Sequence, residues 1–289
     1  MAISFQDKTV GFLRLARPRV AIGYIIAGTS GLFVGFSGIP RDIPGSLLIL
    51  AAILTGAWGI YMINDVFDLE SDIVDSPGRP IPSGIVRRRE AAFLSIALMA
   101  ISVTLGVTTS PDTFILILSL LAIGVLYSVP PARLKRLFFA PNICVALLGA
   151  LTFLVGASIG PAYSASVVFV GLLIFAYGTA AGFVKDFKDV EGDSAVGIRT
   201  LPMIVGMERS ARIAAACLVL AYGFLLIPYF ILDLNFSYPL LILVLLIYTI
   251  WYSTGFLRGP KDKLRRQQFY DRTLHTSITL FVALILGSL

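Results

Sequence analysis

Two acidic stretches carry the residues of this chain that could do chemistry, the first at 64–72 and the second at 185–193. Each follows a long apolar run. If each stretch is helical, each places three oxygen-bearing side chains on one helical face. The two sets are Asn64, Asp68 and Asp72 in the first acidic stretch, and Asp186, Asp189 and Asp193 in the second. Two groups of oxygen donors at the ends of apolar helices predict a cation between them.

Magnesium is the cation that this set of donors favours. The one histidine, His275, and the two cysteines, Cys144 and Cys217, all lie in apolar runs, so zinc, iron and copper sites are poorly supported. Mg²⁺ binds through one or two carboxylates and keeps other positions for water and substrate phosphate oxygens. The sequence therefore predicts Mg²⁺ shared with a phosphate-bearing substrate.

Basic residues that follow the acidic stretches, or lie on the same predicted membrane face, could bind that substrate. They are Arg79, Arg133, Lys135, Lys185 and Arg199. Arginine suits phosphate oxygens bidentately and lysine supplies a point charge. Each buried methylene of an isoprenoid tail would add about 0.8 kcal/mol in the apolar helices below. A prenyl diphosphate is the predicted ligand, with magnesium and the basic side chains stabilising the departing diphosphate.

Aromatic side chains could stabilise the allylic cation that such a reaction leaves behind. Tyr61, Tyr127 and Tyr177 are candidates through their π faces, and the residues alone do not choose among them. Water would quench this cation, so a dry site is needed for a slower nucleophile to react. The second substrate is therefore expected to be a lipophilic acceptor.

The composition places the chain in a membrane. Hydrophobic residues make up 57% and charged residues 14% of it, with a mean hydropathy of +0.89, whereas soluble domains carry roughly 25% charge. The net charge of +6 is spread over short loops rather than gathered in a patch, which is typical of membrane topology and not of nucleic-acid binding. Membrane lipid is the expected surrounding, and no nucleic-acid partner is expected.

Uncharged runs of about 20 residues predict an all-α membrane protein of nine transmembrane helices around a central cavity, forming one domain over 1–289. No early cleavage pattern follows the first basic residues, so the first span should be retained. The predicted spans are Val20–Gly38, Leu47–Ile63, Ala91–Thr108, Thr113–Val129, Ile143–Ile159, Ser166–Val184, Ala211–Leu232, Tyr238–Leu257 and Thr273–Leu289.

The basic residues also predict which side of the membrane each loop faces. Of 23 Lys and Arg residues, only Arg41 falls on one side, and the positive-inside rule makes the other side cytoplasmic. The N-terminus and both acidic stretches should then face the cytoplasm, in what we expect to be a prokaryotic cell membrane.

The two halves of the chain share a sequence pattern. Asn64-Asp65-x-x-Asp68-x-x-x-Asp72 corresponds to Lys185-Asp186-x-x-Asp189-x-x-x-Asp193, after the second and sixth spans. This suggests two four-helix repeats, about 10–140 and 141–270, plus one further helix, related by an axis along the membrane normal. Both acidic stretches would then face one central cavity.

Two further patterns predict packing and pairing. Gly31-x-x-x-Gly35 and Gly156-x-x-x-Gly160 are expected to mark close helix packing within the bundle rather than dimerisation. Asp65 points about 100° away from Asn64 on a helix, so we expect it to cap a helix or to pair with a loop arginine rather than to bind metal.

The first acidic stretch resembles the N-D-x-x-D-x-x-x-D signature of the UbiA superfamily of intramembrane prenyltransferases, and the second resembles its D-x-x-D-x-x-G-D partner. Residues 79–84, 127–131 and 197–202 are similar to further segments of that family, so the resemblance covers nearly the whole chain. It implies nine helices around a cavity capped by acidic loops, with Mg²⁺ bridging prenyl diphosphate. The implied roles are metal binding by Asn64, Asp68, Asp72, Asp186, Asp189 and Asp193, diphosphate binding by Arg79 and Lys135, and a place near the reacting carbon for Tyr127.

The acceptor stays open at this point. An aromatic acceptor, such as a quinone precursor, is the main expectation from the resemblance. Other branches of the family make an archaeal ether lipid from geranylgeranylglyceryl phosphate, or cyclise the diphosphate without an acceptor. A transporter of divalent cations or polyprenyl phosphates is a different class; it would need an exit on the far face, where Arg41, Asp42, Asp112 and Asp233 are the only charged groups expected.

Overall fold

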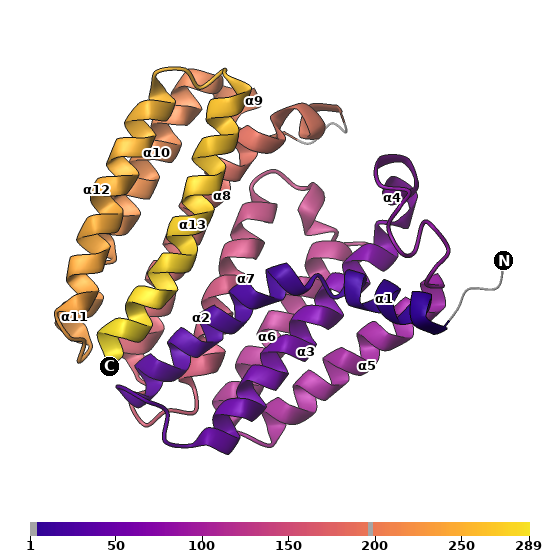
Figure 1. The fold of residues 1–289 in the computed structure, drawn as a ribbon, viewed down its shortest axis with the longest axis horizontal. Coiled ribbons are helices and arrows are strands. Elements are labelled where there is room, and N and C mark those ends of the chain that lie inside the picture. The colour runs from indigo at the N-terminus through magenta and orange to yellow at the C-terminus, as the bar shows by residue number, and fades with distance from the viewer. Residues whose placement is uncertain (1–4, 196–198) are drawn as a thin grey trace.

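The computed structural model describes residues 5–195 and 199–289, without the side chains of Phe5, Arg19 and residues 193–195. Every regular element within these residues is a helix (Figure 1). The elements are α1 (Phe5–Leu15), α2 (Pro18–Phe36), α3 (Ile43–Phe67), α4 (Leu69–Asp75), α5 (Arg88–Val107), α6 (Pro111–Ser128), the 3₁₀ turn η1 (Leu134–Arg136), α7 (Ala140–Ala157), α8 (Ala165–Ala195), α9 (Leu201–Val205), α10 (Met207–Phe224), α11 (Pro228–Ile231), α12 (Ser237–Leu257) and α13 (Lys263–Ser288).

Seven of the nine predicted spans correspond to described helices that are long and apolar enough to cross a membrane: α3, α5, α6, α7, α8, α10 with α11, and α12. The bent pair α1 and α2 would make an eighth. The predicted ninth span is the second half of α13, whose first ten residues are strongly charged. The spans at the two ends of the chain, and the orientation in the membrane, remain predictions.

Local sequence explains where several helices begin. Asp42 caps α3 by accepting a hydrogen bond from the backbone N–H of Gly45, and Ser110 caps α6 through the N–H of Thr113. Both helices carry a proline in the first turn, where no intrahelical N–H is needed. These caps fix the residues at which α3 and α6 begin, and α3 then runs to the first acidic stretch.

The two acidic stretches differ in backbone. The second is helical throughout, because α8 continues to Ala195. The first is broken: α3 ends at Phe67, Asp68 joins the two helices at φ −94° and ψ 1°, and α4 begins at Leu69. The prediction of one continuous helical face from Asn64 to Asp72 is therefore wrong for the first stretch.

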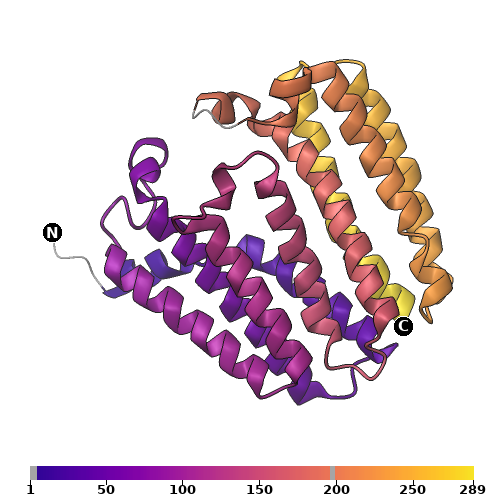
Figure 2. The same ribbon diagram turned by 180° about the vertical axis from the view of Figure 1, so that it is seen from behind.

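The helices form two groups, which meet where α7 packs against α8 and where α2 packs against α13 (Figures 1 and 2). Helices α2, α3, α5, α6 and α7 make one group, and α8, α10, α12 and α13 make the other, with α7 packed against both α2 and α8. The glycine patterns lie at the α2–α7 contact, where a Cβ on Gly31 or Gly156 would stand 2.0 Å from a backbone oxygen of the other helix. Close packing within the bundle is thus confirmed, whereas the internal repeat remains a prediction.

Candidate active site

Both acidic stretches line one cavity of about 510 Å³ at the end of the bundle where α3 and α8 finish. Side chains of both signs surround it. The predicted site residues that line it are Asp68, Tyr127, Lys135, Lys185, Asp186, Asp189 and Arg199. The structure therefore brings residues more than 100 positions apart to one cavity, as the similarity of the two acidic stretches predicts.

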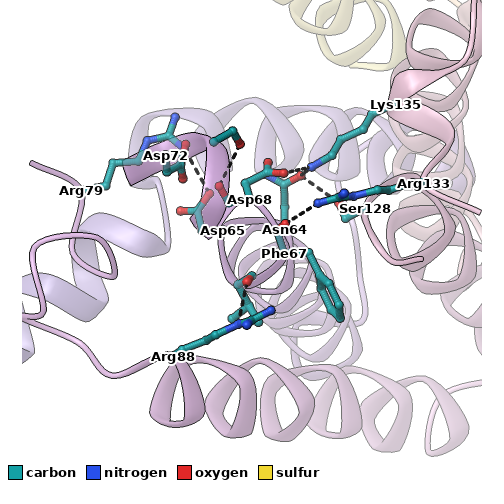
Figure 3. Close-up of polar contacts among 12 residues, drawn as sticks. Asn64, Asp65, Phe67, Asp68, Asp72, Arg79, Arg88, Ser128, Arg133 and Lys135 are labelled. Carbon is teal, nitrogen blue, oxygen red and sulfur yellow. Dashed lines mark hydrogen bonds and ion pairs between the residues drawn. The ribbon is translucent and has the colours of Figure 1, made fainter. Parts of the chain in front are cut away.

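Asp68 and Lys135 form the centre of the first wall (Figure 3). Lys135 makes an ion pair with Asp68 and also donates to the Asn64 side-chain oxygen at 3.1 Å. Ser128 donates to that same oxygen at 2.8 Å. Burial lowers the pKa of Lys135, and its hydrogen bond to Asp68 only partly offsets this. The lysine is held in place by two groups of the first acidic stretch.

Asp72 and Arg79 bind each other instead of lining the cavity. Arg79 donates to both carboxylate oxygens of Asp72, at 2.7 and 2.8 Å, and its Nη1 lies 3.7 Å from Asp65. Partial burial alone would lower the pKa of Arg79, but the hydrogen bond to Asp72 and the negative charges of nearby aspartates together raise this pKa overall. Asp72 therefore pairs with Arg79, which also approaches Asp65, and does not join Asp68 at the cavity as the sequence predicts.

Asp65 is buried and makes an ion pair with Arg17 in the bend between α1 and α2. The expectation that Asp65 pairs with a loop arginine is confirmed. The guanidinium of Arg17 also lies 5.2 Å from the ring centroid of Tyr61, so one arginine joins the amino-terminal bend to α3.

Two arginines cap the end of α3 and so hold the break in place. Arg133 donates to the carbonyl oxygen of Phe67 at 2.6 Å, and Arg88 donates to that of Val66 at 3.1 Å (Figure 3). Cations are favourable at helix C-termini, where carbonyls lack intrahelical partners. Arg133, predicted to bind diphosphate, thus contacts backbone rather than the cavity.

The second wall is built by α8 and the start of α7. Asn142 donates to Asp186 at 3.1 Å, and both side chains are buried. Lys185 lies 3.8 Å from Asp189. Asn142 was missed by sequence reasoning; the available signal was a polar amide that begins an apolar run. The side chain of Asp193, a predicted metal ligand, lies outside the described residues.

The opposite face of the α8 extension is anchored to α13. Buried Arg266 makes an ion pair with Glu191, and the ammonium of Lys188 lies 4.2 Å from the ring centroid of Tyr270. The acidic face of α8 is consequently presented to the cavity by a helix fixed from behind.

Of the three tyrosine candidates, Tyr127 lines the cavity. Tyr61 lies deeper and donates to the Tyr24 hydroxyl at 3.2 Å. Tyr177 is buried in the core of the second helix group and pairs with Ser277 at 2.9 Å. The structure therefore favours Tyr127 as the ring nearest a cavity-bound substrate.

The carboxylates fit a magnesium ion that shares its coordination with substrate. Among the described residues, no three acidic, histidine or cysteine side chains are close enough to hold a metal by themselves. Mg²⁺ needs only one or two carboxylates when water and phosphate oxygens complete its shell. Asp68, Asp186 and Asp189 supply such oxygens from both walls, so the donor set suits Mg²⁺ bound together with a diphosphate.

Comparison with known proteins identifies the family of the chain. The sequence profile of the UbiA prenyltransferase family matches residues 24–285. The chain belongs to the UbiA prenyltransferase family. Like other UbiA proteins with several apolar helices, it is an integral membrane protein, and it is a prenyltransferase.

Archaeal enzymes are among the similar UbiA proteins. A digeranylgeranylglyceryl phosphate synthase of Pyrococcus furiosus is 32% identical over 94% of this chain and 96% of its own length. The enzyme of the same name from Thermococcus gammatolerans is 35% identical over 71% of this chain and 72% of its own.

Solved structures share the fold. One, described as giving insights into digeranylgeranylglyceryl phosphate synthase in membranes, superposes with a TM-score of 0.83 at 26% identity and covers 98% of this chain and 99% of its own. A UbiA homologue from Archaeoglobus fulgidus bound to GPP and Mg²⁺ has a TM-score of 0.69 at 21% identity, covering 95% and 99%.

Proposed function

We propose that this prenyltransferase acts as a digeranylgeranylglyceryl phosphate synthase. It would transfer a geranylgeranyl group from its diphosphate to geranylgeranylglyceryl phosphate and so form an ether lipid. The relatives support this acceptor, because the enzymes of Pyrococcus furiosus and Thermococcus gammatolerans both carry that name. They favour the ether-lipid alternative over the aromatic acceptor that was the main expectation from the sequence.

The distribution of cations in the cavity is the structural observation that carries the proposal. Lys135 and Arg136 line one wall, and Lys185 and Arg199 line the other. A diphosphate donor and a phosphate-headed acceptor both need cationic partners, and a phosphate monoester carries more negative charge than an aromatic carboxylate such as 4-hydroxybenzoate. Cations on both walls therefore suit two phosphate-bearing substrates.

The charges that line the same cavity support a requirement for Mg²⁺. Four carboxylates, those of Asp68, Asp75, Asp186 and Asp189, face the four basic side chains. The lining charges cancel, so two bound phosphate groups would leave the site strongly negative. Mg²⁺ held by Asp68, Asp186 and Asp189 together with phosphate oxygens would supply positive charge where the leaving diphosphate gains negative charge.

Each group of residues at the cavity would then have its own role in the reaction. Lys135, Lys185 and Arg199 bind and orient phosphate oxygens. The bond between the allylic carbon and the diphosphate oxygen would break, and the electron pair would leave with diphosphate. The acceptor hydroxyl oxygen would bond to the carbon, and its proton would pass to the released diphosphate. The face of Tyr127 stabilises the positive carbon, and the apolar helices below exclude water.

An acceptor panel tests the proposal. Purified protein in lipid nanodiscs receives geranylgeranyl diphosphate and either geranylgeranylglyceryl phosphate, 4-hydroxybenzoate, a dihydroxynaphthoate or no acceptor, and mass spectrometry identifies the products. We expect an ether product with the glyceryl phosphate alone, no product with EDTA, and recovery with added Mg²⁺. A prenylated aromatic product, or a cyclised hydrocarbon without acceptor, would refute the proposed acceptor.

A further inference from the structure

A second cavity of about 330 Å³ lies between α12 and α13, outside the candidate active site. Its inner wall is aromatic, formed by Tyr252, Phe256 and Phe269, which belong to the core of the second helix group. Its outer wall carries two arginines, Arg265 and Arg272. None of these residues lines the active-site cavity, so the proposed reaction does not account for them.

The two arginines are arranged as a pair. They are seven residues apart on α13, and therefore lie on one face two turns apart, with Gln268 also lining the cavity between them. The guanidinium of Arg265 donates to the carbonyl oxygen of Gly255 at 2.8 Å. That of Arg272 lies 4.9 Å from the ring centroid of Trp251. Each head is thus held by a contact that leaves further N–H donors available.

The positive charge of these two arginines is largely uncompensated by acidic side chains. Within the described residues neither arginine forms an ion pair. The one carboxylate at the cavity, that of Asp262, accepts a hydrogen bond from the backbone N–H of Arg265 and caps α13. Two oriented guanidinium groups and an amide beside an otherwise apolar wall make a site for an anion.

The position of the cavity along α12 and α13 indicates which kind of anion would bind there. Arg272 is the last charged residue of α13, and an uncharged run to the end of the chain follows it. Its neighbour Trp251 precedes the end of α12 at Leu257 by six residues, about 9 Å along the helix. Arginine and tryptophan at this depth are typical of the membrane interface, which is where lipid phosphates lie.

An exposed apolar stripe continues from the cavity toward the membrane centre. Val244, Tyr248 and Trp251 recur on one face of α12, and they are 54%, 37% and 59% exposed. The Tyr248 and Trp251 rings stack with centroids 5.6 Å apart. A lipid whose phosphate contacts Arg265 and Arg272 would lay its chain along this stripe.

We propose that the α12–α13 cavity binds the phosphate of an anionic membrane lipid, with Arg265, Gln268 and Arg272 as the headgroup ligands and the α12 stripe as the chain contact. Arg265 and Arg272 line a cavity with an aromatic floor that is separate from the active-site cavity and from the basic residues there. The site is independent of the proposed acceptor.

Trp251 provides a direct test, because the chain contains only one other tryptophan, Trp58. The Trp58→Phe protein in nanodiscs is given brominated-chain phosphatidylglycerol or brominated-chain phosphatidylcholine at equal mole fraction, and quenching of Trp251 fluorescence yields the relative binding constant. Since each basic residue near the surface strengthens anionic lipid binding by about fivefold, we expect phosphatidylglycerol to be preferred by at least tenfold. Arg265→Gln with Arg272→Gln should bring the ratio close to one.

A matched control removes two charges from the same membrane face outside the cavity, through Arg258→Gln with Lys263→Gln, and should keep the preference. Inorganic phosphate at millimolar concentration should not remove it either. An equal loss in the control pair, an unchanged ratio in the arginine pair, or displacement by inorganic phosphate would each overturn the proposal. If Trp58→Phe fails to fold, the same ratio follows from the difference in quenching between the native chain and Trp251→Phe.

Discussion

At the scale of single residues, the ion pair between Asp68 and Lys135 is the contact most directly tied to the proposed chemistry. Both side chains line the active-site cavity and each is mostly buried. A buried charge without a partner is costly, so the pair keeps each charge compensated while no substrate is bound. In the proposed reaction, a diphosphate oxygen would replace Asp68 as the partner of Lys135, and the Asp68 carboxylate would then be available to hold Mg²⁺.

Asp68→Asn tests this role, because it removes the negative charge but keeps the size of the side chain. We expect kcat for prenyl transfer to fall by about 100-fold or more, as for loss of a group that stabilises transition-state charge. Glu70→Gln, two residues away and exposed, should stay within about twofold. Turnover is measured at saturating Mg²⁺, with Tm as the check on folding. Equal activity of the two variants would contradict the role of Asp68.

At the scale of elements, the contact between α2 and α7 holds the first helix group together around the site. A Cβ on Gly156 would stand 2.0 Å from the carbonyl oxygen of Gly28, and one on Gly160 equally close to that of Gly35. These neighbours are backbone atoms of another helix, so they move only if the helices separate. Because α7 also supplies Asn142 to Asp186, a shift of this helix would reach the second wall.

Gly156→Ala should therefore destabilise the protein by about 1–3 kcal/mol through overpacking. Gly149, on the same helix, has open space where its Cβ would lie. Gly149→Ala should be neutral or stabilise by up to about 1 kcal/mol, since glycine is a poor helix former. Thermal unfolding in detergent measures both, and a lower Tm for Gly149→Ala than for Gly156→Ala would show that the close approach does not limit stability.

At the scale of the whole molecule, the two ends of the bundle differ in charge. The end that carries the active-site cavity holds nearly all basic residues, whereas Arg41 stands alone at the other. Seven helices long and apolar enough to span a membrane separate these ends. The positive-inside rule then predicts that the cavity faces the cytoplasm.

Site-directed labelling checks this orientation. In a background with Cys144→Ala and Cys217→Ala, exposed positions at the two ends are replaced singly by Ser71→Cys and Ser164→Cys. A membrane-impermeant maleimide applied to intact cells should label the variant at position 164. It should reach the variant at position 71 only after permeabilisation. The reverse pattern would place the cavity outside the cell.

The sequence by itself determined the class of the protein, seven of its apolar helices and the close glycine contacts, because these follow from composition, from the length of uncharged runs and from the spacing of residues within one segment. Only the tertiary structure decided that the chain breaks at Asp68, that Asp72 turns to Arg79, and that Asn142 supports Asp186. Arg88 and Arg133 cap the end of α3 at this break from 22 and 66 residues away. Contacts across such separations leave no periodic pattern, so they emerge only when the helices are packed.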